Sequence, residues 1–375
     1  MITFAQFTEI VEQLAPLKYA YEWDNSGVQA HVHDEVSKVL VCLDMTKDTL
    51  REAKEKGCDT ILAHHPVLFR QVTNLEKNHV VTGLIVDAVR NGINVYSAHT
   101  SFDCAPGGIN DLLAEKLGLV DTEVLAEERE LEEKMAQVVV FAPQDCEDEV
   151  KHAMAEAGAG SLGNYSGAAF TTYGMGEFTP EAGAQPYIGE IGAHETVREM
   201  RIEMVCPMEK AAAVAGAARA AHCYEEPSIQ VYPLVMPVKK IGLGVIGRPE
   251  REMTLRELAE DVKSRTGGIV RICRLPEEKM SGKALKVAQI GGAGGEFSWL
   301  AAKMGCQALI TGEAKYNHFI DAAAAGVLLI EAGHFETESC FVEGMIKGLQ
   351  QKSDMLQYNL TLFASEKGVR PYDEV

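Results

Sequence analysis

The sequence predicts an α/β protein in which two similar α/β halves form a core and an inserted α+β domain lies between them. Three observations predict this architecture. Short apolar runs alternate with helical patterns near both ends of the 375-residue chain, the two ends share matched residue pairs, and the composition changes between them. Strands that alternate with helices are typical of parallel, doubly wound sheets.

The first half shows the alternation along residues 38–103. The predicted strands, which have polar ends, are KVLVCLD (38–44), DTILAHHP (59–66) and INVYSAHTSFD (93–103). The predicted helices between them are DTLREAKEKG (48–57) and VTGLIVDAVRNG (81–92). The first seventeen residues have helical apolar spacing and no basic start, which indicates an amphipathic helix rather than a signal peptide. Ligands of such folds bind at the carboxyl ends of the strands.

The far end of the chain repeats this pattern. Lys38-Val39 and Gly57-Cys58 recur as Lys286-Val287 and Gly305-Cys306, both offset by 248 residues. We interpret this as a weak internal duplication. It predicts a first half at 1–127, an inserted domain at 128–235 and a second half at 236–375.

The insert has its own element order. The predicted elements are, in order, an acidic lead-in and strand (130–143), a helix (146–160), a strand (166–174), a strand (197–207), a helix (209–222) and a strand (227–234). The order βαββαβ predicts a ferredoxin-like unit. Its glycine-rich loops suit either ligand binding or solvated connections.

Composition narrows the class of protein. A net charge of −20 and a sequence pI near 5.0 disfavour nonspecific binding to nucleic acid or to an anionic membrane, since both require a cationic face. No run approaches the ~20 apolar residues of a membrane span. Nine cysteines without a CxxC pair predict reduced thiols and a cytoplasmic protein.

Plausible metal ligands gather in four short stretches, each after an apolar run. These are AHHP (63–66), AHTSFD (98–103), ITGE (310–313) and GHFETE (333–338). Histidines and carboxylates without thiolate suit zinc, manganese, iron or cobalt. Five of these residues could hold two ions if a carboxylate bridges them: His64, His65, Asp103, His334 and Glu338. His334 and Glu338 are four residues apart, so one helical face would carry both.

Each feature has a second interpretation that the residues leave open. His64 and His65 could be half-buried histidines bonded to backbone, and His99 could orient a ligand or lie in the core. Asp44 could support a ligand or cap a helix. Trp23-Asp24-Asn25 could form a binding lip, although packing is favoured. GGAGG (291–295) could cradle phosphate, but a tight strand–helix turn is favoured.

The motifs that carry a family resemblance are HHP after an apolar strand, AHT…D, TGE…K, GHxxxE and an N-terminal WDNSG. Through them the chain resembles, over nearly its whole length, the dinuclear-metal-centre family labelled GTP cyclohydrolase I type 2 homologue (NGG-interacting-factor-like). The resemblance implies a toroidal homohexamer and a PII-like or copper-tolerance-like insert. It also implies two divalent ions per chain, held by the five residues above, with Glu338 as the bridge. The family often has aspartate where Glu313 stands and Asn-Leu where Ser101-Phe102 stands.

The resemblance implies hydrolysis, with metal-activated water attacking a nucleotide or heterocycle such as the guanine ring of GTP, and with His99 or Glu313 as acid or base. Two alternatives remain: a metal-dependent phosphoesterase, and a non-enzymatic ring-shaped scaffold or regulator whose insert senses a ligand. By the 248-residue offset, Glu313 takes the place of His65 in the second half, so we expect Glu313 near the metals.

Overall fold

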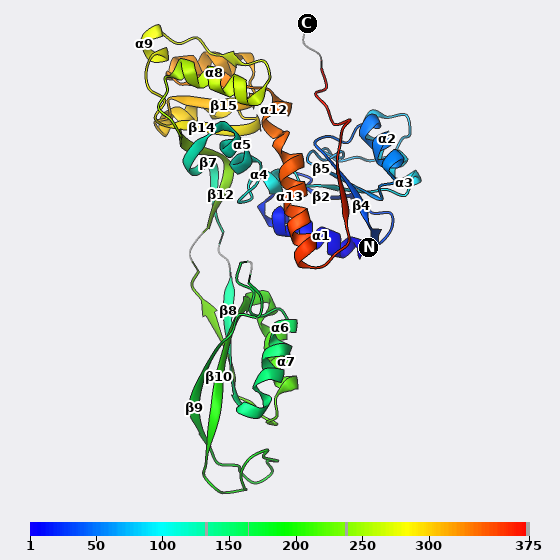
Figure 1. Ribbon diagram of the computed structural model, residues 1–375, viewed down its shortest axis with the longest axis vertical. Coiled ribbons are helices and arrows are strands. Elements are labelled where there is room, and N and C mark those ends of the chain that lie inside the picture. Colours follow the sequence, from blue (N-terminus) through cyan, green and yellow to red (C-terminus); the bar gives the residue numbers. More distant parts are fainter. Residues whose placement is uncertain (132–133, 164, 237–238, 373–375) are drawn as a thin grey trace. The chain divides into compact units, whose positions relative to one another are not determined.

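The computed structural model describes residues 1–131, 134–163, 165–236 and 239–372 (Figure 1). Residues 132 and 133 of the predicted acidic lead-in, residue 164 in a glycine-rich loop and the last three residues of the second half lie outside this description. The chain forms two compact units. The first combines Met1–Arg129 with Lys240–Val375, and the second is Glu130–Lys239.

The first sheet of the larger unit has the order β17-β4-β5-β6-β2. Its strands are β2 (Gly27–Ala30), β4 (Lys38–Cys42), β5 (Thr60–Ala63), β6 (Asn94–Ser97) and β17 (Thr361–Ala364). Strands β17, β4, β5 and β6 are parallel and β2 is antiparallel to β6. All four residues of β5 are buried, as expected for a central parallel strand.

The second sheet has the order β13-β16-β15-β14-β12-β7. Its strands are β7 (Leu119–Leu131), β12 (Lys239–Pro249), β13 (Arg271–Ile272), β14 (Val287–Ala293), β15 (Ala308–Glu313) and β16 (Leu328–Glu331). Strands β14, β15 and β16 are parallel, while β12 pairs antiparallel with β14 and β13 pairs antiparallel with β16.

The repeated sequence pattern coincides with a repeated register. Val39 lies opposite Thr60 in the β4–β5 pair, and Val287 lies opposite Ala308 in the β14–β15 pair. Both residues of the second pair follow those of the first by 248 positions. The edges of the sheets cross the predicted halves, however, because β7 joins the second sheet and β17 joins the first. Edge pairing over such long separations leaves no local sequence signal.

Helices cover the sheets and connect them. They are α1 (Phe4–Leu14), α2 (Lys47–Lys56), α3 (Val80–Arg90), α4 (Thr100–Asp103), α5 (Ile109–Leu117), α8 (Leu255–Thr266), α9 (Glu277–Met280), α10 (Ser298–Lys303), α11 (Tyr316–Ala325), α12 (His334–Glu338) and α13 (Cys340–Met355). A short pair of strands, β1 (Ile2–Thr3) and β3 (Glu35–Val36), lies beside α1. Helix α13 packs on both α1 and α5, and α12 contacts β14 and β15 (Figure 1).

Local capping explains where several helices begin and end. Thr3 and Thr254 close capping boxes at the starts of α1 and α8. Helix α2 starts at N-cap Thr46 and ends at Gly57 with φ 67°. None of the helices in the described part of the chain is long and apolar enough to cross a bilayer.

The smaller unit contains β8 (Met135–Pro143), α6 (Glu147–Glu156), β9 (Phe170–Phe178), β10 (Glu195–Pro207), α7 (Ala211–Ala221) and β11 (Ile229–Leu234). Its sheet has the order β11-β8-β10-β9 and its pairs are antiparallel. Helices α6 and α7 pack together, and Val150 and Val214 bury their side chains with Val138, Val140 and Ile202 of the sheet. The element order over 135–234 is the one that the sequence predicts.

One prediction about the cysteines is wrong. Cys146 and Cys223, 77 residues apart, form a disulfide in the smaller unit, whereas the sequence predicts nine reduced thiols. Seven cysteines are free, and six of these are buried. Pairing across 77 residues depends on the tertiary fold, which brings the loop before α6 next to the segment after α7.

Candidate metal centre

The five predicted ligands meet in one place in the larger unit. His64 and His65 directly follow β5, Asp103 ends the short helix α4 after β6, and His334 and Glu338 begin and end α12. The carboxyl ends of neighbouring parallel strands share one sheet edge, and this edge brings the first three together. Helix α12 supplies the other two from the second sheet.

His64 is fully buried and has one unused lone pair. Its Nδ1 lies 2.8 Å from the carbonyl oxygen of Ala98, so Nδ1 carries the proton and donates. Its Nε2 lies 3.6 Å from Asp103 Oδ1 and 3.9 Å from Glu338 Oε1. Neither His64 Nε2 nor Asp103 Oδ1 has a hydrogen-bond partner among the described residues. Two buried acceptors that face each other without a donor fit a shared cation.

His65 and His334 flank the other oxygen of Glu338. Their Nε2 atoms lie 3.0 Å and 3.1 Å from Glu338 Oε2, with ring centroids 5.4 Å apart. These three side chains form a group with the composition and spacing of a metal site. Glu338 therefore directs Oε1 toward His64 and Oε2 toward His65 and His334.

The remaining ring nitrogens of these histidines are held by carboxylates. His65 Nδ1 lies 2.8 Å from Asp44 Oδ1, and His334 Nδ1 lies 3.1 Å from Glu313 Oε2. A carboxylate on the far nitrogen is the usual device that orients a metal-binding imidazole. Glu313, placed by the 248-residue offset, thus contacts His334 of the cluster.

His99 lies beside the cluster and is oriented in the same way. Its Nδ1 lies 2.7 Å from Asp24 Oδ1, and its ring centroid is 5.3 Å from that of His64. Asp24 Oδ2 also accepts hydrogen bonds from the hydroxyls of Ser26 and Thr100. His64, His65 and His99 form a second group with metal-site spacing.

The electrostatics divide the histidines into two classes. Burial lowers the pKa of His64 to about 3, which keeps the ring neutral with Nε2 as an acceptor. Burial also opposes charge on His65 and His334, but the nearby carboxylates raise their pKa values to about 10 and about 9. Any cation that binds at these two rings must displace a proton from each.

The carboxyl groups also differ in the direction in which their pKa values are shifted. Burial raises the pKa of Asp103 to about 7. Glu338 is also buried, but the rings of His334 and His65 hold its pKa well below the usual value. Burial opposes ionisation of Asp24 as well, and hydrogen bonds from His99, Ser26 and Thr100 nevertheless hold the pKa of this carboxyl below its usual value.

Glycines of the second sheet make room for Glu338. Gly292 has φ 62°, and a Cβ there would lie 2.2 Å from Glu338 Oε1. A Cβ on Gly312 would lie 2.4 Å from Thr337 Oγ1. The GGAGG stretch therefore serves as the tight strand–helix turn, ending β14 and leading into the one-turn segment Gly295–Phe297.

A cavity of about 560 Å³ opens beside the cluster. His65, His99, His334, Asp103 and Glu338 line it, together with an apolar wall of Trp23, Phe69, Leu243, Ile290 and Phe297. Trp23 is 59% exposed, stacks on Tyr21 and meets Phe69 edge-on at 6.1 Å. No lysine or arginine is among the described residues that line this cavity.

Sequence reasoning gives too little weight to three residues. It favours packing for Asp24 and Trp23, yet Asp24 orients His99 and Trp23 lines the cavity. Helix capping is a rival role for Asp44 in the sequence, but Thr46 is the N-cap of α2 and Asp44 bonds His65. The sequence signal for Asp44 is its position, because Asp44 comes shortly after β4 and His64 comes directly after β5.

Fold and site together define a class: a mixed α/β protein that gathers histidines and carboxylates, without thiolate, into a candidate metal-binding group. The family model of DUF34/NIF3 (NGG1p interacting factor 3) matches residues 2–371, and the chain belongs to this family.

Relatives support this assignment over the full length. A Bacillus subtilis (strain 168) protein named GTP cyclohydrolase 1 type 2 homolog is 35% identical over 368 residues, which cover 98% of this chain and 97% of that protein. The crystal structure of a Bacillus cereus protein related to NIF3 is 36% identical, with a TM-score of 0.79 over 100% of this chain and 99% of that one. A Staphylococcus aureus crystal structure is 26% identical, with a TM-score of 0.69 and the same coverage.

Proposed function

We propose that the protein binds two divalent metal ions and uses them for hydrolysis. His64 and Asp103 would hold one ion, His65 and His334 the other, and Glu338 would bridge them with its two oxygens. The observation that carries the proposal is the pair of buried acceptors, His64 Nε2 and Asp103 Oδ1, for which the described part of the chain offers no donor. The donor set suits Zn²⁺, Mn²⁺, Fe²⁺ or Co²⁺.

Bound ions would supply Lewis-acid polarisation and activation of water. The residues of the chain then have separate tasks. His99, whose Nδ1 is held by Asp24, keeps Nε2 free for proton transfer to or from a substrate in the cavity. Glu313, which the sequence offers as a second acid or base, engages His334 and would act as a positioning residue.

The cavity favours a planar heterocyclic substrate. Trp23 and Phe69 offer aromatic surface beside the cluster, and aromatic side chains stack well on nucleobases. The name of the Bacillus subtilis relative points to GTP, and hydrolytic opening of its guanine ring is our first candidate reaction. With no lysine or arginine among the described lining residues, a triphosphate would depend on the metal ions for charge compensation. Phosphoester cleavage at the same ions is the competing reaction.

The first test is metal content by elemental analysis with a parallel GTP assay. We expect about two equivalents per chain in the wild type, and in Glu338→Ala both fewer equivalents and no turnover. The control is Glu343→Ala, a residue of α13 that does not line the cavity. Ring opening and phosphate release are followed separately, so the assay distinguishes the two reactions. A wild type that binds no metal after reconstitution would refute the metal site itself.

A regulatory role is the second candidate, and the ligand-sized cavity in the smaller unit favours it. We propose that this unit is a ferredoxin-like, PII-like insert, since it has the βαββαβ order with the sheet order β11-β8-β10-β9. The corresponding division is 1–127, 128–235 and 236–375. Two bound metals without turnover of any tested substrate would favour the regulator.

The assembly and location of the protein are also proposals. We propose a toroidal homohexamer, as the resemblance of the sequence motifs implies, and a location in the cytoplasm. Light scattering of the purified chain tests the hexamer, and a mass of about one or two chains would refute it.

A further inference from the structure

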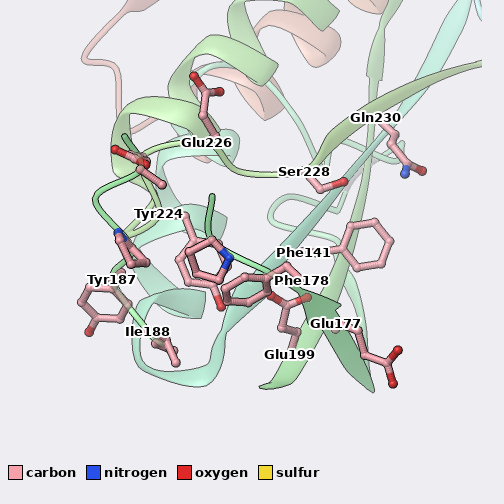
Figure 2. Close-up of a pocket in the computed structure, with 15 residues that line it drawn as sticks. Phe141, Glu177, Phe178, Tyr187, Ile188, Glu199, Tyr224, Glu226, Ser228 and Gln230 are labelled. Carbon is pink, nitrogen blue, oxygen red and sulfur yellow. The ribbon is translucent and has the colours of Figure 1, made fainter. Parts of the chain in front are cut away.

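The smaller unit contains a cavity of its own, of about 450 Å³. This volume lies within the range of small-molecule sites. Four aromatic side chains line it: Phe141 of β8, Phe178 of β9, Tyr187 of the following loop and Tyr224 after α7 (Figure 2). All of the lining residues belong to the 130–239 unit, so the chemistry of this cavity is independent of the metal centre.

Tyr224 is at the centre of the aromatic wall. Its ring centroid lies 6.1 Å from that of Phe178 and 6.3 Å from that of Tyr187, and both pairs are strongly inclined. The ring of His222 lies 5.1 Å away on another side. Rings inclined in this way are not stacked face to face on one another, and the face of an aromatic ring carries negative potential.

The polar lining is acidic. Glu177, Glu199, Glu225 and Glu226 line the cavity, and no lysine or arginine is among the described lining residues. Glu226 has a partner in Arg219 at 2.9 Å. Glu225 accepts a hydrogen bond from the backbone N–H of Gln185, which leaves its charge in place. Glu199 projects toward Tyr224 and Phe178 (Figure 2).

The groups around Tyr224 add no positive charge to the wall. Burial lowers the pKa of His222, whose Nε2 contacts the Phe141 carbonyl oxygen while Nδ1 accepts from the backbone N–H of Tyr224. Burial and the neighbouring Glu199 raise the pKa of the Tyr224 hydroxyl, which therefore keeps its proton. The cavity thus combines aromatic faces with negative charge.

The walls are held together from three directions. The Cys146–Cys223 disulfide joins residues directly next to Asp145 and Tyr224. The hydroxyl of Tyr187 donates to Asp145 Oδ2 at 2.6 Å. The Gln185–Glu225 hydrogen bond adds a third connection. Walls that are already connected lower the conformational cost of binding.

We propose that this cavity is a binding site for an organic cation, namely a substituted ammonium group attached to an apolar body. Aromatic faces and carboxylates both attract such a group, and quaternary ammonium ions are recognised by aromatic walls of this kind. An anion would be repelled by the glutamates of the lining, and a neutral apolar molecule would not use the charge of Glu199.

The test compares choline with its neutral carbon isostere 3,3-dimethylbutan-1-ol on the full chain, by calorimetry and by NMR of the ring protons. We expect choline to saturate one site per chain and to bind at least about tenfold more tightly than the isostere. Glu199→Gln should weaken choline about fivefold and Tyr224→Leu about tenfold. Glu156→Gln, an exposed change on α6 outside the cavity, should have no effect.

Equal binding of the two probes, or no saturable binding of choline, would overturn the proposal. If Tyr224→Leu does not fold, the near-isosteric Glu199→Gln still decides the matter. Choline affinity should be the same in Glu338→Ala as in the wild type, since that change lies in the other unit. A failure of the metal centre and a failure of this site are therefore separate results.

Discussion

The two parallel sheets of the larger unit share a register but place different chemistry at their strand ends. After β5 the first sheet presents His64 and His65, whereas at the end of β15 the second presents Gly312 and Glu313, both at the 248-residue offset. The partner positions also differ, because Asp44 of the first sheet corresponds to Gly292 of the second.

The difference has a steric cause. In the second sheet the space above the strand ends is filled by α12, which carries His334 and Glu338. A side chain at Gly292 would meet Glu338, and one at Gly312 would meet Thr337. One sheet thus supplies ligands from its own strand ends, and the other supplies them from the helix for which its glycines leave room.

The largest expected effect is a difference between substitutions of His65 and of Glu313, which occupy corresponding positions in the two sheets. His65→Ala removes a ring that faces Glu338 Oε2, so we expect turnover to fall at least about a thousandfold, with loss of one ion. Glu313→Ala removes only the carboxylate behind His334, and should weaken metal affinity about 10- to 100-fold. The GTP assay measures turnover, elemental analysis counts the bound ions, and metal titration gives the affinity of each variant. Equal losses in the two variants would show that the sheets contribute alike.

Metal binding should depend strongly on pH. The raised pKa values of His65 and His334, about 10 and about 9, mean that both rings hold protons at neutral pH, and binding must release them. Affinity for the ions should therefore rise with pH between about 7 and 9, by about a hundredfold per pH unit for two released protons. Calorimetry in buffers of different ionisation enthalpy counts the protons. An affinity that falls as pH rises would contradict the assignment of these rings.

The partner of His65 offers a smaller change with a distinctive signature. Asp44→Asn removes the negative charge that helps His65 hold its proton, and it also loosens the ring. We expect metal affinity to fall about tenfold at pH 9, and proton release at pH 7 to drop by about one. Asp48→Asn, an exposed residue of α2 that pairs with Arg51, is the matched control. Unchanged proton release would mean that Asp44 does not set the charge of His65.

These residues also show how far the sequence alone could lead. The five ligand candidates could be predicted because strand ends and helical spacing are local patterns along the chain. Asp24 was missed as a partner of His99 because 75 residues separate them. The pairing of β17 with β4, the placement of β7 in the second sheet and the Cys146–Cys223 disulfide also depend on contacts made only in the folded chain. Local pattern therefore predicts elements and ligand types, while partners across the fold require the structure.

The smallest expected effect tests the steric cause directly. Gly292 and Gly305 both have positive φ, 62° and 79°, so alanine at either position is strained by about 1–2 kcal/mol. A Cβ at Gly305 would meet none of the described residues within 4 Å, whereas one at Gly292 would lie 2.2 Å from Glu338 Oε1. Gly292→Ala should therefore lower the free energy of unfolding by about 1–3 kcal/mol more than Gly305→Ala, measured by urea denaturation without metal. It should also weaken metal binding, because Glu338 must move. If the two variants are equally stable and bind metal alike, the positive φ alone accounts for glycine at both positions. The contact between α12 and the second sheet would then not be the reason for glycine at position 292.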